Sequence, residues 1–405
     1  MLRLYNSMGK QLQAFRPVNP NLVNIFTCGP SVYQRAHIGN FRTFLFEDVL
    51  VKYLEFSGYK VKRGMNFTDI EDKAVIEAEK RHKTVKRLTE VNIKSFLEEA
   101  SLLKMKRPDY LPRASQAVDE AVGIIEQLIA CGVAYWYKGD VYFDPLKFPG
   151  FGKIYGLDMS RWPKTKKRFS KDTYPGMRWN LGDFILWHGR KGGERDYWDT
   201  KIGAGRPAWN IQDASMVNRY FHEPLSIYCG GIDNLVRHHD YTRAILESVR
   251  PYPMARFWLH CEHLFVNGRK MSKSKGNIYY TDTLIKEGYS PSEIRFFLIC
   301  NHYRERINYS EKNMQKSAEG LKELKRLARS IRGRARGEPQ ACFKTAIRLR
   351  KAFVDHMDDD LNLRKAVDAV QVLLAAIKPE VLKPGEATDI LGVLKDIDRV
   401  LNVLF

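Results

Sequence analysis

The sequence predicts an α/β protein in which a parallel sheet precedes a helical, basic C-terminal segment. Near the N-terminus a β-rich run (22–27), a loop, a segment with helical apolar spacing (41–59) and a second β-rich run (59–68) follow one another. This order is the opening of a parallel sheet with a crossover helix. A further β-rich run appears at 225–231, and helical spacing continues from about residue 310 to Phe405.

The first elements surround a turn-rich loop. The run LVNIFT ends at Cys28-Gly29-Pro30, and the following helix has apolar residues at helical spacing until Gly58. Residues 73–131 read as helices, and a strand pair is expected in AYWYKGDVYFDP. Residues 145–208 are rich in Gly, Pro, Trp and Lys, which indicates an insertion that interrupts the sheet.

The second half returns to the sheet pattern. We expect a strand at 225–231, a helix at 238–249 and one further strand at 257–266. The segment GLKELKRLARSIRGRARG then predicts a strongly basic helix, and two or more amphipathic helices follow Pro339.

Composition narrows the functional classes. The chain has 405 residues, of which 44% are hydrophobic, and a formal net charge of +20. No apolar run approaches the roughly 18 residues that span a bilayer, and no signal peptide is evident, so we expect a cytoplasmic protein with no membrane partner. Its six cysteines lack paired spacing, which argues against a disulfide framework. The positive charge favours a nucleic-acid partner, a solvated basic surface being the alternative.

Two short segments have residue types that suit phosphate. His37-Ile38-Gly39-Asn40 lies where a loop becomes a helix, and a helix N-terminus favours anions; taken alone, His37 and Asn40 are also consistent with ordinary caps. The segment 270–277, KMSKSKGN, places three lysines in a glycine-flanked loop after a strand. Charge-assisted bonds from such lysines could stabilise a departing pyrophosphate; taken alone, the lysine run is also consistent with a solvated basic loop.

Both segments resemble the two signatures of class I aminoacyl-tRNA synthetases, HIGN at 37–40 in its common variant and KMSKS at 270–274. Further segments are similar to cysteinyl-tRNA synthetases in family order, namely FTCGPSVYQRAHIGNFRTF, NFTDIEDK, GRPAWNIQDASM, IYCGGIDNLVRHHDYT, NHYRERINYSEKNM and MDDDLN. The chain is therefore identified as resembling that family along its whole length.

The resemblance implies a Rossmann-type catalytic domain with a connective insertion, followed by a C-terminal α-helical bundle. The expected domains are the two catalytic halves (1–135 and 209–266), the insertion (136–208), a stem-contact region with KMSKS (267–310) and the bundle (311–405).

The same resemblance implies ATP-dependent formation of an aminoacyl adenylate with ATP, Mg²⁺ and an amino acid, and then transfer to an acceptor, with tRNA expected. His37, Asn40, Lys270 and Lys273 would be catalytic. The ATP site would comprise Gly29, His37, Gly39, Asn40, Gly230, Gly231, Asp233 and Lys273, and the amino-acid pocket would comprise Cys28, Thr68, Trp209, Asp213, His238 and Thr242.

The sequence departs from the family at its zinc ligands, which are two cysteines, a histidine and a glutamate. Cys28 and His238 match, whereas Asp213 replaces the second cysteine and Thr242 replaces the glutamate. Cys28, Asp213 and His238 could still hold Zn²⁺ through the carboxylate, but we expect the site to be degenerate. Cys229 stands where the family has glycine, and we interpret it as an altered contour of the nucleotide site, the alternative being a compensating ligand. Without zinc, Asp213 would need another metal, a cationic residue or a cationic group of the substrate. An amino acid other than cysteine, or a cysteine derivative, is then the expected substrate.

The acceptor stays open at this point. The chain stops near the end of the expected bundle, so a family-type anticodon-reading domain is not expected. The basic run 164–171 and the basic helix at 322–336 would contact an acceptor stem through phosphates, or else form solvated charged faces. The alternatives are transfer to a small-molecule amine, as in the related mycothiol-pathway ligase, and a non-catalytic RNA-binding paralog.

Overall fold

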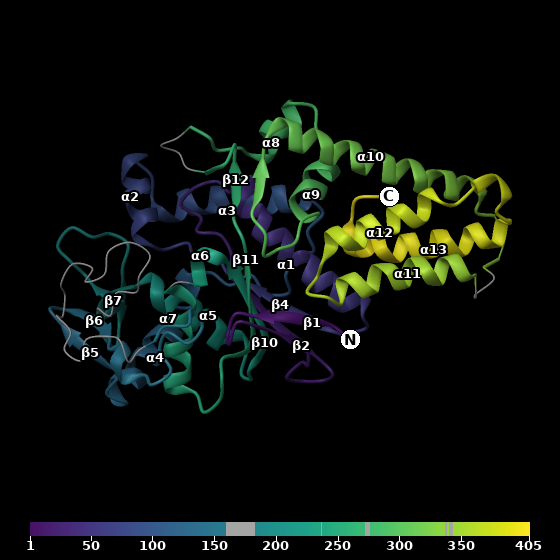
Figure 1. Cartoon of the computed structure of the whole chain (residues 1–405). Helices are drawn as coiled ribbons and strands as arrows, with labels where there is room; N and C mark the ends of the chain where they lie inside the picture. Colours follow the sequence, from purple (N-terminus) through teal and green to yellow (C-terminus); the bar gives the residue numbers. More distant parts are fainter. Residues whose placement is uncertain (159–182, 236, 272–275, 337, 340–342) are drawn as a thin grey trace.

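The computed structural model shows an elongated molecule with a sheet-containing half and a helical bundle at one end (Figure 1). It describes residues 1–158, 183–235, 237–271, 276–336, 338–339 and 343–405. None of the helices in these ranges is long and apolar enough to cross a membrane.

A four-stranded parallel sheet forms the centre of the molecule, in the order β11-β10-β3-β4. Its strands are β3 (Val23–Thr27), β4 (Val61–Met65), β10 (Leu225–Gly231) and β11 (Ala255–Cys261). All residues of β3 and β10 are buried because helices cover both faces. This confirms the predicted parallel α/β sheet.

Side chains that alternate along the inner strands enter two different cores. Ile25 and Ile227 face the core that also contains helix α1 (Ile38–Phe56), whereas Phe26 and Tyr228 face the core shared with helices α5 (Trp209–Tyr220) and α7 (His238–Val249). The strand period of two places successive residues on opposite faces. Residues next to each other at the carboxyl ends of β3 and β10 therefore meet different helices.

The single strand expected at 257–266 is wrong, because the segment forms two strands in different sheets. Strand β11 ends at Cys261, and β12 (Leu264–Val266) pairs with β13 (Arg269–Lys270) and β14 (Ile307–Tyr309). Between them the Glu262 N–H donates to the Tyr303 carbonyl (2.8 Å), which takes the backbone out of the parallel ladder.

A separate antiparallel sheet, β5-β6-β7-β9-β8, lies beside the parallel sheet. Its strands are β5 (Ala134–Tyr137), β6 (Asp140–Phe143), β7 (Phe184–Gly189), β8 (Trp198–Thr200) and β9 (Gly203–Pro207). The predicted pair in AYWYKGDVYFDP is present as β5 and β6. The basic run at 164–171 lies outside the described residues.

The remaining elements lie around the parallel sheet, except the 3₁₀ turn between α12 and α13, which contacts α10. They are the hairpin β1 (Arg3–Asn6) and β2 (Gln11–Ala14), helices α2 (Asp72–Lys80), α3 (Val85–Leu102), α4 (Val118–Ala130), α6 (Ile232–Leu235), α8 (Thr281–Lys286) and α9 (Pro291–Ile299), and the 3₁₀ turns Ala114–Gln116, Pro145–Lys147 and Pro379–Val381.

Four amphipathic helices form the C-terminal bundle (Figure 1). They are α10 (Glu311–Arg334), α11 (Lys344–Met357), α12 (Leu363–Ala375) and α13 (Pro384–Leu401). Buried Arg295 on α9 joins the bundle to the sheet-containing half, because it donates to the Leu401 carbonyl (2.6 Å) and to Asp48 on α1 (2.7 Å). Lys52 also pairs with Asp48 (2.7 Å). The bundle is thus attached through a buried charge network as well as apolar contacts.

Candidate active site

A cavity of about 330 Å³ opens where β3 and β10 end. Ligands of open α/β sheets bind at this carboxyl edge. The cavity lining includes His37, Gly39 and Asn40 from the first signature and Lys270 from the second. The structure therefore brings the two segments together at one cavity.

His37 caps helix α1 and keeps one ring nitrogen available. The Asn40 N–H donates to His37 Nδ1 (3.3 Å) while Asn40 Oδ1 accepts from the His37 N–H (3.0 Å), which forms a capping box. Burial lowers the pKa of His37 to about 4. The neutral ring consequently carries its proton on Nε2, where it can donate to a ligand.

The start of α1 offers few free backbone donors. Ile38 N–H donates to the Tyr279 carbonyl (3.0 Å), and Asn40 N–H is used by the cap. Within the described ranges, only Gly39 of these three N–H groups has no acceptor. A Cβ on Gly39 would lie 3.1 Å from the His37 ring, so glycine allows the ring to fold over the helix start.

Lys270 reaches the cavity from β13. Its Nζ lies 3.4 Å from His263 Nε2, and both residues line the cavity together with Asp233. Lys73 also lines it, with its ammonium group 5.5 Å from the Tyr33 ring centroid. Lys273, which was predicted to contact the pyrophosphate, lies outside the described residues.

At two of the glycines predicted for the nucleotide site, packing inside the protein leaves no space for a larger residue. A Cβ on Gly29 would lie 1.8 Å from the Asn66 carbonyl oxygen, and a Cβ on Gly230 would lie 2.8 Å from the His239 ring. Gly29 and Gly231 line the cavity, whereas Gly230 is absent from its lining. The glycine run thus allows close packing behind the cavity wall.

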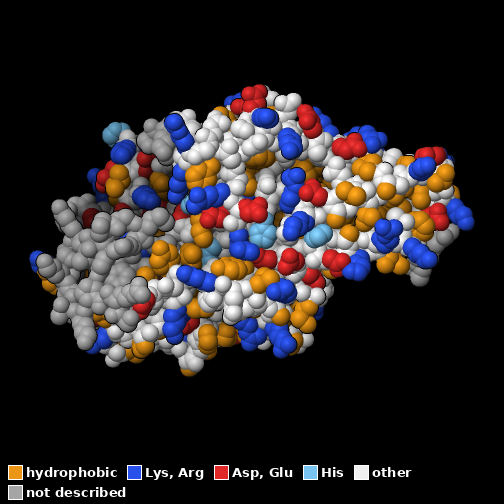
Figure 2. Space-filling view, in the orientation of Figure 1, with side chains coloured by type: hydrophobic (Ala, Val, Ile, Leu, Met, Phe, Trp, Pro, Cys, Tyr) orange, Lys and Arg blue, Asp and Glu red, His pale blue; other side chains and the backbone are white. Residues whose placement is uncertain are grey.

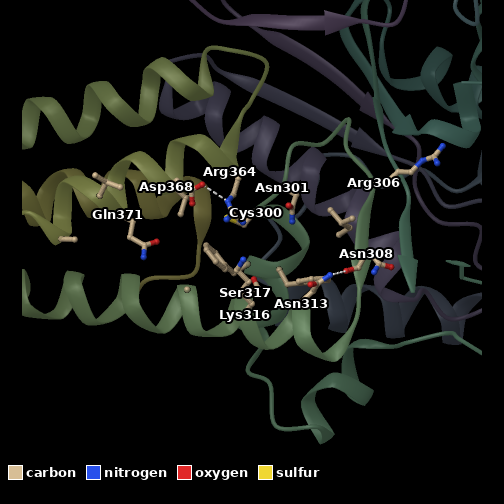
Figure 3. Close-up of a pocket in the computed structure, with 17 residues that line it drawn as sticks. Cys300, Asn301, Arg306, Asn308, Asn313, Lys316, Ser317, Arg364, Asp368 and Gln371 are labelled. Atoms are coloured by element: carbon tan, nitrogen blue, oxygen red, sulfur yellow. Dashed lines mark hydrogen bonds and ion pairs between the residues drawn. The ribbon is translucent and has the colours of Figure 1, made fainter. Parts of the chain in front are cut away.

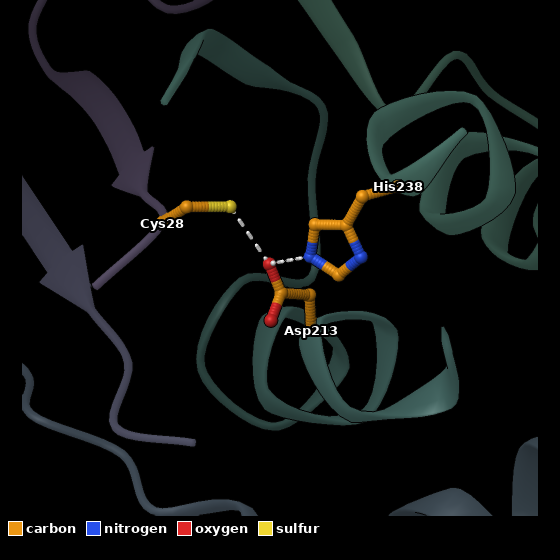
Figure 4. A group of neighbouring side chains, drawn as sticks. All are labelled: Cys28, Asp213 and His238. Atoms are coloured by element: carbon orange, nitrogen blue, oxygen red, sulfur yellow. Dashed lines mark hydrogen bonds and ion pairs between the residues drawn. The ribbon is translucent and has the colours of Figure 1, made fainter. Parts of the chain in front are cut away.

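Cys28, Asp213 and His238 meet in a buried cluster (Figure 4). Asp213 Oδ2 accepts from Cys28 Sγ (2.9 Å), from the Tyr228 hydroxyl (2.7 Å) and from His238 Nε2 (3.1 Å), and Asp213 Oδ1 accepts from Asn66 Nδ2 (3.0 Å). Burial alone would raise the pKa of Asp213, but His238 and these hydrogen bonds lower it overall. The carboxylate is thus stabilised by donors of the protein itself.

A chain of hydrogen bonds extends from Cys28 into the core. Cys28 Sγ lies 3.1 Å from His239 Nε2, His239 Nδ1 lies 2.8 Å from His260 Nε2, and His260 Nδ1 lies 2.7 Å from Ser7 Oγ. The Cys28 proton is directed at Asp213, so His239 Nε2–H is the donor to sulfur. His260 Nε2–H and then the Ser7 hydroxyl are the next donors in the chain. Burial lowers the pKa of His260 to about 3, consistent with a neutral ring.

The other residues of the predicted amino-acid pocket lie around this cluster. Trp209 is 38% exposed and stacks on His238, with ring centroids 4.0 Å apart. Thr242 Oγ1 donates to the His238 carbonyl (2.9 Å), and Thr68 Oγ1 lies 3.4 Å from Asn66 Nδ2. Of the six predicted pocket residues only Cys28 lines the cavity.

Cys229 does not belong to this cluster, so the alternative in which it compensates for a missing ligand is not supported. Cys229 follows Tyr228 on β10, so its side chain enters the opposite core, and it is outside the cluster of potential metal ligands found among the described residues.

Sequence reasoning did not identify Tyr228, His239, Asn66 or Lys73. Tyr228 replaces the histidine in the family segment IHGGGID, and this change was a signal that could have revealed a partner for Asp213. The contact from His239 to Cys28 depends on three-dimensional packing across the sheet and has no local signal.

A second groove of about 690 Å³ lies between α10, α12, the end of α9 and β14. Lys316 and Ser317 project from α10 and Gln371 from α12 (Figure 3). Throughout the described part of the chain, no residue forms a hydrogen bond or ion pair with the side chains of Lys316, Ser317, Asn301 or Gln371. The groove therefore presents unused polar groups over an apolar floor that includes Phe296 and Val367.

Comparison with solved structures defines the class of fold. The structure superimposes on Mycobacterium tuberculosis methionyl-tRNA synthetase in complex with methionyl-adenylate with a TM-score of 0.65, at 14% identity, over 95% of this chain and 92% of that one. A LeuRS–tRNA–LeuAMS ternary complex from Agrobacterium radiobacter K84 gives 0.69, at 12% identity, over 96% and 85%. The fold is that of class I aminoacyl-tRNA synthetases.

Sequence comparison assigns the family. Residues 14–319 match the model of the tRNA synthetases class I (C) catalytic domain. The chain is 35% identical to a cysteine–tRNA ligase of Solibacter usitatus over 100% of this chain and 87% of that protein, and 34% identical to one of Chlamydia pneumoniae over 100% and 86%. The chain therefore belongs to the class I (C) tRNA synthetase family.

Proposed function

We propose that this protein is an ATP-dependent ligase that joins an amino acid to AMP and then to tRNA. The observation that supports this most directly is the position of His37, Asn40 and Lys270 at one cavity on the carboxyl edge of the parallel sheet. Family membership supports the same chemistry, since relatives are named cysteine–tRNA ligases.

In the activation step the substrate carboxylate attacks the α-phosphorus of ATP, and pyrophosphate leaves. No covalent bond to the enzyme is required, so catalysis consists of positioning and charge stabilisation. His37 Nε2–H and the Gly39 N–H are donors for phosphate oxygens, and Lys270 supplies a positive charge. Mg²⁺ accompanies ATP and neutralises part of its charge. Asp233, which also lines the cavity, is proposed to accept from the ribose, and Lys273 is proposed to contact the pyrophosphate.

Exchange of labelled pyrophosphate into ATP, measured with each amino acid, tests this proposal. His37→Ala and Lys270→Ala should each reduce exchange by about 10- to 150-fold, the effect of losing one charge-assisted or phosphate-bound hydrogen bond. Lys94→Ala, an 80% exposed lysine on α3, is the matched control and should retain full activity. Unchanged exchange in both cavity variants would exclude the proposed site.

We propose tRNA as the acceptor because of the surface chemistry as well as the family. Figure 2 shows Lys and Arg side chains distributed over the described part of the visible face, with Asp and Glu between them. The α10–α12 groove adds Lys316 and Arg306 beside free amide groups, a combination that suits phosphate and ribose contacts.

The groove can be tested separately from the catalytic cavity. Lys316→Ala should weaken tRNA binding and reduce the slope of log K against log salt by about 1, and leave pyrophosphate exchange unchanged. Lys395→Ala, an exposed lysine on α13 outside the groove, should leave binding within about twofold. Equal effects of the two variants would argue against the groove.

A further inference from the structure

Asp213 is the centre of a closed set of hydrogen bonds. Its two carboxylate oxygens accept from four protein donors, which belong to Cys28, Tyr228, His238 and Asn66. Asp213 is 1% exposed and Tyr228 is fully buried, so water has little access to the carboxylate. A buried carboxylate needs compensation of this kind, and here the protein supplies all of it.

The spacing of the cluster suits hydrogen bonds better than a metal ion. Tetrahedral zinc with one sulfur, one oxygen and one nitrogen ligand separates sulfur from oxygen by about 3.6 Å and oxygen from nitrogen by about 3.4 Å. The observed distances from Asp213 Oδ2 are 2.9 Å to Cys28 Sγ and 3.1 Å to His238 Nε2. Both pairs are in donor–acceptor contact and lie closer together than two ligands of one tetrahedral zinc ion.

His238 also lacks the support that metal-binding histidines have. Such a histidine almost always donates its second ring nitrogen to a carbonyl, a carboxylate or water. His238 Nδ1 is buried and has no hydrogen-bond partner among the described residues. Thr242 uses its hydroxyl on the His238 carbonyl and provides no fourth ligand.

We propose that Asp213, Tyr228 and Thr242 together convert the family's zinc site into a metal-independent hydrogen-bond cage that fixes Cys28. Asp213 replaces a ligand thiolate, and Tyr228 supplies the donor that satisfies the new carboxylate. Thr242 removes the remaining acidic ligand. The three changes compensate one another, and His239, supported by His260, orients the Cys28 sulfur from behind.

The cage also determines what the cavity presents to an amino acid, a consequence that rests on the proposed activation function. Only the Cys28 side of the cage reaches the cavity, and the Asp213 oxygens are already occupied. Beside the cage, a cationic side chain would find both Asp213 oxygens occupied by protein donors, and an anionic side chain would meet the negative charge of Asp213. The proposed substrate is therefore an amino acid with an uncharged side chain, selected without metal–thiolate coordination.

Metal binding can be tested without any catalytic assay. The full-length protein, purified from zinc-supplemented medium, should contain less than about one tenth of a zinc ion per chain. Added cobalt(II) chloride should produce no thiolate-to-cobalt absorption band, and EDTA should leave the Tm unchanged. One zinc per chain, a cobalt–thiolate band or a Tm lowered by EDTA would overturn the proposal. These results do not depend on enzymatic activity, so they can fail independently of the proposed function.

Two variants probe the cage itself. Tyr228→Phe should lower the Tm by several degrees, because Asp213 loses a buried donor. The triple variant Asp213→Cys, Tyr228→His, Thr242→Glu should acquire one zinc per chain and the cobalt–thiolate band. A Tyr228→Phe protein with an unchanged Tm would contradict the cage even if the triple variant does not fold.

Amino-acid selection provides the last test. In pyrophosphate exchange, kcat/KM for cysteine should exceed that for serine by no more than about 200-fold, the limit for small differences without a metal contact. Preference for cysteine beyond this range, or activation of lysine or aspartate in place of uncharged amino acids, would overturn the specificity assigned to the cage.

Discussion

At the scale of single residues, the cavity depends on a glycine whose position leaves no space for a side chain. Gly29 follows the strand β3, and its N–H donates to Asn66 Oδ1 (2.8 Å). The position where a Cβ would stand lies 1.8 Å from the Asn66 carbonyl oxygen, which belongs to a backbone held by the neighbouring loop. Gly29 thereby holds Asn66 in place to donate to Asp213.

Gly29→Ala should reduce the free energy of unfolding by about 3 kcal/mol or more, because backbone atoms must move to admit the methyl group. Gly392→Ala is the matched control. Gly392 lies in the exposed interior of α13, where a Cβ meets no atom within 4 Å, and alanine should stabilise by about 0.5–1 kcal/mol. Urea denaturation of the two variants measures both effects, and similar midpoints would refute the explanation.

Buried neutral histidines give stability a defined pH dependence. The pKa of His37 is lowered to about 4 and that of His260 to about 3, both because of burial. The unfolded chain takes up these protons near pH 6.5. The stability due to neutral burial is fully present above pH 6.5 and is lost as pH falls towards 4.

His260→Gln should therefore show a shallower loss of unfolding free energy between pH 6.5 and 4, by up to about 1.4 kcal/mol per pH unit. Urea midpoints at several pH values, compared between wild type and variant, measure the slope. Parallel curves for the two proteins would show that His260 does not remain neutral in the folded state.

The sequence predicted some of these residues and missed others for physical reasons. His37, Asn40 and Lys270 belong to local segments whose residue types suit phosphate, and the fold brings them to one cavity. Tyr228, His239 and Asn66 became evident only in three dimensions, because strand alternation and helix packing decide which core each side chain enters. The prediction of one strand at 257–266 was wrong because the apolar composition continues where the chain passes from the parallel sheet to the sheet of β12.

At the scale of elements, α9 joins the parallel-sheet half to the bundle. Arg295 on α9 and Lys52 on α1 both pair with Asp48, which is fully buried. Burial alone would raise the pKa of Asp48, but Arg295 and Lys52 lower it overall. Asp48 is therefore charged, and it compensates two cations at the junction of three elements.

Asp48→Asn should lower the free energy of unfolding by about 3–5 kcal/mol, since it leaves buried positive charge without its counter-ion. The comparable pair on the surface is Lys351 and Asp355 on α11, with side chains 70% and 54% exposed. Asp355→Asn should change stability by no more than about 1 kcal/mol. If Asp48→Asn lowered the free energy of unfolding in urea no more than Asp355→Asn does, the junction would not depend on charge.

At the scale of the whole molecule, the net charge of +20 gives each step a different sensitivity to salt. Binding of a polyanion releases counter-ions and weakens steeply with salt, whereas amino-acid activation involves small ligands. Raising KCl from 50 to 200 mM should therefore reduce tRNA charging at subsaturating tRNA by at least about tenfold, with pyrophosphate exchange changed less than about threefold. Equal losses in the two assays would argue against an RNA acceptor, and so would charging that is insensitive to salt.

Contacts between residues that are far apart in the chain also affect how the protein folds during synthesis. Arg3 pairs with the backbone at Asp358, and Arg295 is satisfied only when Leu401 is in place. Asp398 in turn accepts from the N–H groups of Val403 and Leu404. A nascent chain on the ribosome cannot form these contacts until the residues around 401 have emerged. Helix α1 is synthesised long before, so the surface that it presents to α13 stays uncovered until α13 has emerged.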